Sequence, residues 1–154
     1  MHLDVPGLRV RALTFDDLAA LQALLHACRD YFRLADGRAP ASSAALERLA
    51  DAAGDAATEL LGIEDAGALI GLLELRRGVE GLMVVLLLLR PSARGQHAGR
   101  RVVEALIPAA RAEGHREISL GVQDHEAQAH AFWLAMGFRP VQHLEGVTDY
   151  ALSL

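Results

Sequence analysis

A run of eight apolar residues, from Leu82 to Leu89, constrains the fold of this chain more than any other feature of its sequence. The run is too short to cross a membrane as a helix, which takes about 20 apolar residues. A glycine precedes it and the dipeptide Arg90-Pro91 follows it, and these flanks favour a strand that is buried on both faces. We therefore expect the run to form a central strand of a sheet.

The segments around this run alternate between the period of a strand and the period of a helix. Strands are expected at residues 8–13, 59–63, 68–76, 117–122, 138–144 and 147–152, and helices at residues 14–34, 41–53, 98–114 and 124–136. Thr14, with Asp17 three residues later, resembles a capping box and predicts where the first helix begins, and Asp124 is expected to cap the last helix. The order predicts an α+β fold, in which a mixed, mostly antiparallel sheet of about seven strands packs against about four helices.

Length and composition narrow the class of protein. A chain of 154 residues fits one domain, which we expect to span residues 1–154, and an apolar fraction of 52% excludes a disordered chain. The net charge of −5 argues against nucleic acid as a partner, and no signal peptide or membrane span is visible, so a cytoplasmic protein is expected. The one cysteine, Cys28, lies on the apolar face of the first helix and is expected in the core.

The segment between the apolar run and the next helix carries the residues most suited to chemistry. Gly95 and Gly99 let the backbone approach an anion closely, and Arg94 and Arg100 add positive charge. The first turn of the following helix presents unpaired N–H groups, which bind phosphate. These residues predict a pyrophosphate site, although an ordinary turn between strand and helix is equally compatible with them.

Residues 94–99 read RGQHAG, and residues 129–138 read AHAFWLAMGF. The first block resembles the acetyl-CoA motif of the GNAT N-acetyltransferase superfamily, Q/R-x-x-G-x-G/A. It matches at Arg94 and Gly99 and departs at His97, where the family prefers glycine. The second block is similar to the family pattern A-x-x-[FL]-Y-x-x-x-G-F. The expected order of elements also matches, so the resemblance covers nearly the whole chain.

The resemblance implies that acetyl-CoA is the co-substrate. Backbone groups of Leu87, Leu88 and Leu89 would pair with the pantetheine arm, in a gap where this strand splays from the strand at residues 117–122. The residues implied to hold the pyrophosphate are Arg94, Gly95, Gln96, His97, Ala98, Gly99 and Arg100. Phe132 and Trp133 would line the thiol arm.

Two positions depart from the family in ways that affect its chemistry. Trp133 stands where the family has a tyrosine that protonates the departing thiolate, and an indole N–H is not a usable acid. The pKa of a thiol is about 8.5, so its thiolate is able to leave without an acid. Glu126 stands where the family often has an asparagine that bonds to the pantetheine arm, and a glutamate does not donate that bond.

An amine acceptor of ordinary pKa needs a base, and the resemblance implies a carboxylate on or near the central strand. Glu80, just before the apolar run, is the predicted catalytic base. Glu74, on the preceding strand, is an alternative, and either residue also fits a solvated carboxylate. Tyr31 and Phe32 fall in the region that walls the acceptor pocket in the family, and core packing explains them equally well.

The predicted function is therefore transfer of an acetyl group from acetyl-CoA to an amine of a small molecule or peptide by direct attack, and a homodimer is compatible with the resemblance. Two alternatives stay open: a non-catalytic CoA-binding or regulatory module of the same fold, and an unrelated phosphate-binding α+β domain. No metal is expected, because His125 and His130 are five residues apart, off one helix face, with no cysteine beside them.

Overall fold

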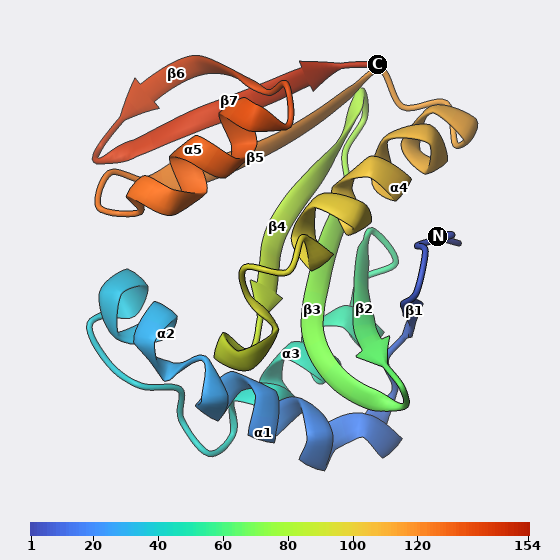
Figure 1. The fold of residues 1–154 in the computed structure, drawn as a ribbon, viewed down its shortest axis with the longest axis vertical. Coiled ribbons are helices and arrows are strands. Elements are labelled where there is room, and N and C mark those ends of the chain that lie inside the picture. Colours follow the sequence, from blue (N-terminus) through green and yellow to red (C-terminus); the bar gives the residue numbers. More distant parts are fainter.

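The computed structural model describes residues 1–154 and contains a seven-stranded sheet with helices on both faces (Figure 1). The strands are β1 (Arg9–Ala12), β2 (Thr58–Asp65), β3 (Ala68–Arg77), β4 (Gly81–Leu89), β5 (Glu117–Gln123), β6 (Arg139–Leu144) and β7 (Val147–Ser153). The helices are α1 (Leu18–Ala27), α2 (Arg29–Asp36), α3 (Ala44–Gly54), α4 (Ala98–Ala112) and α5 (Ala127–Ala135), with short 3₁₀ turns η1 (Phe15–Asp17) and η2 (Pro91–Ala93). None of the helices combines the length and the apolar character needed to cross a bilayer.

The strand order is β1-β2-β3-β4-β5-β7-β6, and every neighbouring pair is antiparallel except β4 and β5. The predicted mixed, mostly antiparallel sheet is thus confirmed. Two hydrophobic clusters cover its faces. One gathers buried side chains under α4 and α5, and the other gathers buried side chains from α1, α2 and α3.

The helix predicted over residues 14–34 is broken in the structure, which is why there is one α-helix more than expected. The capping box is confirmed, because the Thr14 N–H donates to Asp17 Oδ2 at 2.8 Å and the Thr14 side chain accepts from the first turn. The chain leaves helical geometry at Cys28, with φ −96° and ψ 23°, and α2 begins at the next residue. No glycine or proline marks this break, and the apolar spacing continues through it, so the sequence carried no signal for it. As expected, Cys28 is buried.

The central strand β4 is not buried on both faces along its whole length. Met83 is 47% exposed and Val85 is 44% exposed, so the prediction is wrong at these two positions. The register between β3 and β4 shifts at Val85, which forms a β-bulge. Before the bulge Val84 packs in the cluster under α4, and after it Leu86 and Leu88 pack against α1 and α3. The first half of β4 therefore packs in one hydrophobic cluster and the second half packs in the other.

The parallel ladder between β4 and β5 is short. It runs from Gly81 opposite Glu117 to Met83 opposite Ser119 and then stops. Beyond that point the two strands diverge, as Figure 1 shows, and α5 and α2 lie on either side of the space between them. The predicted splay of the central strands is confirmed.

Candidate active site

The divergence of β4 and β5 leaves a gap of about 70 Å³. Its walls are apolar side chains and glycine, apart from Tyr31 of α2 and Glu126 at the start of α5. The other lining residues are Val84, Val85, Leu86, Leu87, Leu120, Gly121, Val122, Ala129 and Trp133. Because the ladder has ended, backbone N–H and C=O groups along this gap have no partner strand, and they need partners from a ligand or from water.

The loop after β4 ends in a helix start that suits an anion. The first helical hydrogen bond of α4 runs from the Arg101 N–H to the His97 carbonyl at 3.0 Å. The N–H groups of residues 98–100 therefore have no backbone acceptor, and the positive end of the helix dipole lies there. Gly95 has φ +75° and His97 has φ +63°, so both are left-handed. A residue with a Cβ pays about 1–2 kcal/mol in that conformation, so the backbone at position 97 favours glycine over histidine.

Gly99 has a different role from Gly95. A Cβ built on Gly99 would lie 3.6 Å from Phe132 Cζ and 3.7 Å from Leu89 Cδ1, which are ordinary van der Waals contacts. The protein itself therefore has room for a methyl group at position 99, and any strict need for glycine there comes from a ligand. Phe132 packs over this first turn and joins the loop to α5.

Arg94, predicted to hold a pyrophosphate, is already engaged. Its Nη1 donates to Asp30 Oδ2 at 2.7 Å, its Nη2 to Asp30 Oδ1 at 3.3 Å, and its Nε to the Leu89 carbonyl at 2.9 Å. The same carbonyl accepts from the Cys28 thiol at 3.4 Å. The hydrogen bonds from Arg94 hold the pKa of the Asp30 carboxyl below its usual range. Nothing in the sequence predicts this pair, because Asp30 and Arg94 are 64 residues apart.

Two other loop residues are also paired. Arg100 Nε donates to Glu104 Oε1 at 2.8 Å along the exposed face of α4. Gln96 Nε2 donates to the Ser92 carbonyl at 3.3 Å and closes the loop upon itself. This segment thus offers backbone N–H groups directly, whereas Arg94 and Arg100 are shared with carboxylates.

The structure brings one carboxylate to the gap, and it is not Glu80. Glu80 is exposed at the paired end of β4, where its carbonyl accepts from the Arg116 N–H at 3.2 Å, so it is remote from the point where the strands part. Glu74 is ion-paired with Arg48 on the face covered by α3. Glu126 lines the gap, and its Oε2 accepts from the Gln123 N–H at 3.1 Å. Its Oε1 has no hydrogen-bond partner in the protein.

Asp124 does not cap α5. Its carboxylate contacts His143 Nε2 at 2.9 Å instead, and Glu126 is the residue that precedes the helix. The loop before α5 is therefore held by the Glu126–Gln123 bond, which also fixes the carboxylate of Glu126 beside the gap. The expected cap is wrong because the side chain of Asp124 turns toward β6.

Aromatic residues lie on two sides of the gap, and those on the α5 side are more tightly packed. Trp133 is 6% exposed and packs edge-on against Phe132 and Phe138, with ring centroids 4.9 and 5.0 Å apart. Tyr31 lines the opposite side of the gap, and burial together with the Glu126 charge raises the pKa of its phenol. Phe32 does not line the gap, because its side chain is buried in the cluster of α1 and α3.

The second tyrosine, Tyr150, does not line the gap, and its hydroxyl is hydrogen-bonded to His130. His130 Nε2 lies 2.9 Å from the Gln123 carbonyl, which only accepts, so this nitrogen carries the proton. The other ring nitrogen, Nδ1, then accepts from the Tyr150 hydroxyl at 2.7 Å. His130 is held in one orientation and does not meet His125, and no group of three or more His, Cys, Asp or Glu residues could hold a metal ion.

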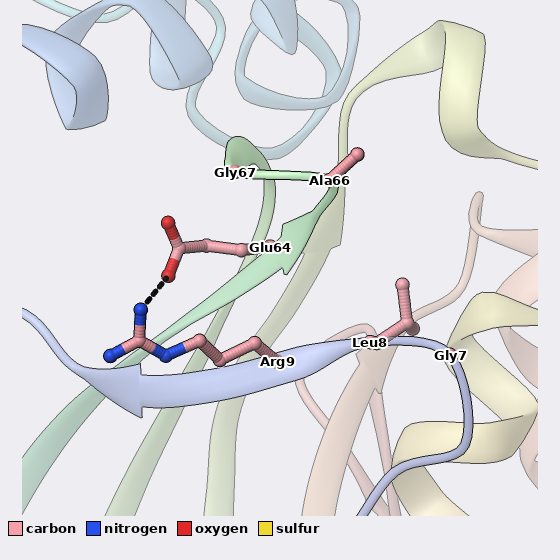
Figure 2. Close-up of a pocket in the computed structure, with 6 residues that line it drawn as sticks. All are labelled: Gly7, Leu8, Arg9, Glu64, Ala66 and Gly67. Carbon is pink, nitrogen blue, oxygen red and sulfur yellow. Dashed lines mark ion pairs between the residues drawn. The ribbon is translucent and has the colours of Figure 1, made fainter.

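A larger hollow, of about 380 Å³, lies far from the gap, between β1 and the turn after β2 (Figure 2). Figure 2 shows its two charged side chains facing each other, and Arg9 Nη1 lies 3.9 Å from Glu64 Oε1. Glu64 also accepts from Arg11 Nε at 2.8 Å. Because its carboxylate is already compensated, this hollow offers no reactive group, and its size alone does not make it a site.

The site therefore combines an open sheet parted between β4 and β5 with a helix start at the end of the parted strand whose N–H groups have no backbone acceptor, an arrangement that suits an acyl-CoA transferase. Residues 20–138 match the acetyltransferase (GNAT) family, and the chain belongs to this family. Among curated proteins, no sequence matches this chain.

Solved structures agree with the family. An acetyltransferase from Thermus thermophilus is 25% identical and superposes with a TM-score of 0.88 over 100% of both chains. The PaiA N-acetyltransferase of Thermoplasma acidophilum, solved with coenzyme A, is 16% identical, with a TM-score of 0.78 over 96% of this chain and 99% of that one. The spermidine N-acetyltransferase of Vibrio cholerae, solved with CoA and spermine, is 20% identical, with a TM-score of 0.79 over 96% and 95% of the two chains.

Proposed function

We propose that this protein transfers an acetyl group from acetyl-CoA to an amine of a small molecule or peptide. The observation that carries the proposal is the early end of the β4–β5 ladder at Met83 and Ser119, which opens a gap beside a strand that runs on to the unpaired N–H groups of α4. Such a gap suits an acyl-pantetheine arm, and such a helix start suits a pyrophosphate. The neighbours solved with coenzyme A support the same co-substrate.

The residues present fit acetyl-CoA in chemical terms. The N–H groups of residues 98–100, with Arg94 and Arg100 beside them, would receive the pyrophosphate. The unpaired edges of β4 and β5 would pair with the amides of the pantetheine arm. The ring of Phe132 packs against Gly99 in the first turn of α4. A backbone N–H on the β5 side of β4 would stabilise the oxyanion that forms when the thioester is attacked.

Glu126 takes the place of Glu80 as the proposed proton acceptor. The acceptor ammonium gives one proton to the Glu126 carboxylate, and the neutral amine attacks the carbonyl carbon of the thioester. A C–N bond forms, the C–S bond breaks, and the CoA thiolate leaves with the bonding pair. The nitrogen then loses its second proton to the thiolate or to solvent, which leaves a neutral amide and free CoA. Trp133 supplies packing and no proton. The thiolate is a good enough leaving group without an acid, because the pKa of a thiol is about 8.5.

An acceptor screen tests the proposal. Acetyl-CoA is incubated with the protein and a panel of monoamines, polyamines, amino acids and peptides, and the release of CoA thiol is followed together with the mass of the product. Acceptor-dependent thiol release with an acetylated product is expected. A protein that binds CoA but releases no thiol with any amine would instead be a non-catalytic CoA-binding module.

A further inference from the structure

The wall of the gap formed by α2 is held more lightly than the walls formed by β4 and β5. Phe32 is the only buried residue of α2, and Leu34 is 68% exposed. Val84 of β4 and Leu120 of β5 are each 4% exposed, and both strands are hydrogen-bonded into the sheet. The single buried residue of α5, Trp133, packs against Phe132 and Phe138. If the gap widens at α2, Tyr31 moves with that helix.

The gap is narrow for a ligand site. Pockets for small molecules measure about 300–1,000 Å³. The space between Tyr31 and the opposite wall is about 70 Å³, so a wider gap would take an acyl-pantetheine arm more easily.

A single pair of side chains fastens the first turn of α2 to the loop that precedes α4. Asp30 precedes Tyr31 in that turn, and both of its carboxylate oxygens accept from Arg94, at 2.7 and 3.3 Å. The pair is solvent-exposed, with Arg94 39% and Asp30 57% exposed. Exposed ion pairs are weak, so a stronger anion is able to displace Asp30 from the guanidinium. The remaining polar tie from α2 across the gap, from Gln123 Nε2 to the Ala35 carbonyl, is 3.5 Å long.

We infer that the Asp30–Arg94 pair is a latch that keeps α2 and Tyr31 over the gap until a pyrophosphate takes Arg94 from Asp30. The inference rests on the proposed binding of CoA to the loop before α4. Asp30 acts through Arg94 and is a positioning residue. Because the pyrophosphate binds only the state in which Asp30 has released Arg94, it shifts the protein toward the open gap. The latch thus couples binding of the pyrophosphate of CoA at Arg94 to entry of the pantetheine arm into the gap.

The latch predicts that removing Asp30 improves the binding of CoA. Calorimetric titration of CoA at low salt into wild type, Asp30→Asn, Arg94→Ala and the double variant measures this. We expect Asp30→Asn to bind CoA about threefold to fivefold more tightly than wild type, because the competing carboxylate is gone. The gain should vanish in the Arg94→Ala background and shrink at high salt.

Asp36→Asn is the matched control. It removes the same charge from the same helix, and Asp36 makes no hydrogen bond to Arg94. Its affinity for CoA should equal that of wild type, which separates the latch from a general attraction between CoA and a less acidic protein. Quenching of Trp133 fluorescence by acrylamide gives a second readout, and it should rise in Asp30→Asn without CoA because Tyr31 no longer covers the gap.

The possible failures are distinguishable. Unchanged or weaker CoA binding by Asp30→Asn, or an equal gain in Asp36→Asn, would overturn the latch and leave the proposed function intact. A persistent gain in the Arg94→Ala background would also overturn it. Absence of CoA binding by wild type would overturn the proposed function and the latch together.

Discussion

Both the β1–β2 edge and the β4–β5 gap contain arginine–carboxylate pairs, but the pairs have different roles in the two places. At the edge, Arg11 donates to Glu64 at 2.8 Å and to both oxygens of Asp17, at 2.7 and 3.0 Å, and these carboxylates are only 11% and 12% exposed. At the gap, Arg94 meets a carboxylate that is 57% exposed. The two arginines are similarly exposed, at 32% for Arg11 and 39% for Arg94, so the difference lies in their partners. Largely buried carboxylates hold the edge together, whereas an exposed carboxylate is one that a ligand is able to displace.

The largest effect expected concerns the carboxylate of the gap. Glu126→Gln should lower kcat with acetyl-CoA by about 100-fold, because a proton acceptor contributes roughly 10² to 10⁴. The amide keeps an oxygen to accept from the Gln123 N–H, so the melting temperature should change little. Steady-state kinetics with an acceptor from the screen measures the effect. Glu80→Gln is the control, and a larger loss in that variant would contradict the assignment.

The Arg94 side chain gives the next effect. Arg94→Ala should weaken CoA binding about tenfold, because a charge-assisted hydrogen bond contributes roughly 1.5–3 kcal/mol and the loss of Asp30 competition offsets part of it. Calorimetry measures the change. Arg100→Ala, which removes an arginine paired along its own helix, should weaken binding less. Equal affinity in wild type and Arg94→Ala would place the pyrophosphate elsewhere.

The β1–β2 edge should respond in stability and not in binding. Hydrogen bonds from Arg11 hold the pKa of Asp17 below its usual range. The stabilisation from Asp17 is therefore complete at neutral pH, begins to decline below about pH 4, and is lost as the pH falls through the lowered pKa. Asp17→Asn should lose about 1–2 kcal/mol in the free energy of unfolding at pH 7 and show a shallower acid decline.

Urea titrations of wild type and Asp17→Asn between pH 3 and pH 7 measure how the free energy of unfolding depends on pH. This range spans the ordinary aspartate pKa of about 4. The affinity for CoA at pH 7 should be the same in both proteins. A change in CoA affinity would break the division between the two regions, because it would show that the edge also shapes the gap.

Features with local signals could be predicted from the sequence, and long-range ones could not. The Thr14 capping box and the glycine-containing turn between β4 and α4 follow from residues close in the chain. Anion binding at this turn stays a prediction. The bulge at Val85 lies within eight consecutive apolar residues, where no periodicity marks a change of face. The Arg94–Asp30 pair and the placement of Tyr31 and Glu126 at one gap depend on the packing of elements distant in sequence. From the sequence, Glu80 is the predicted base and Glu74 the alternative, and Glu126 is not considered for this role.

The smallest effect expected is at His97. Its φ of +63° costs a residue with a Cβ about 1–2 kcal/mol. Glycine loses more conformational entropy on folding, which offsets part of this gain, so His97→Gly should raise the free energy of unfolding by at most about 1 kcal/mol. In a chain of this size that corresponds to a rise in melting temperature of about 2–4 °C. Thermal unfolding followed by circular dichroism measures it. A lower melting temperature would mean that the imidazole makes a stabilising contact that outweighs the strain.

The most direct test of the account is a CoA titration followed by calorimetry and by tryptophan fluorescence together. The chain has one tryptophan, Trp133, and it lies in the gap, so its emission reports on that region and not on the larger hollow at the β1–β2 edge. The account predicts binding of one CoA per chain, with an emission change that yields the same Kd as the heat. Heat without an emission change would place CoA outside the gap, and no heat at all would contradict CoA binding itself.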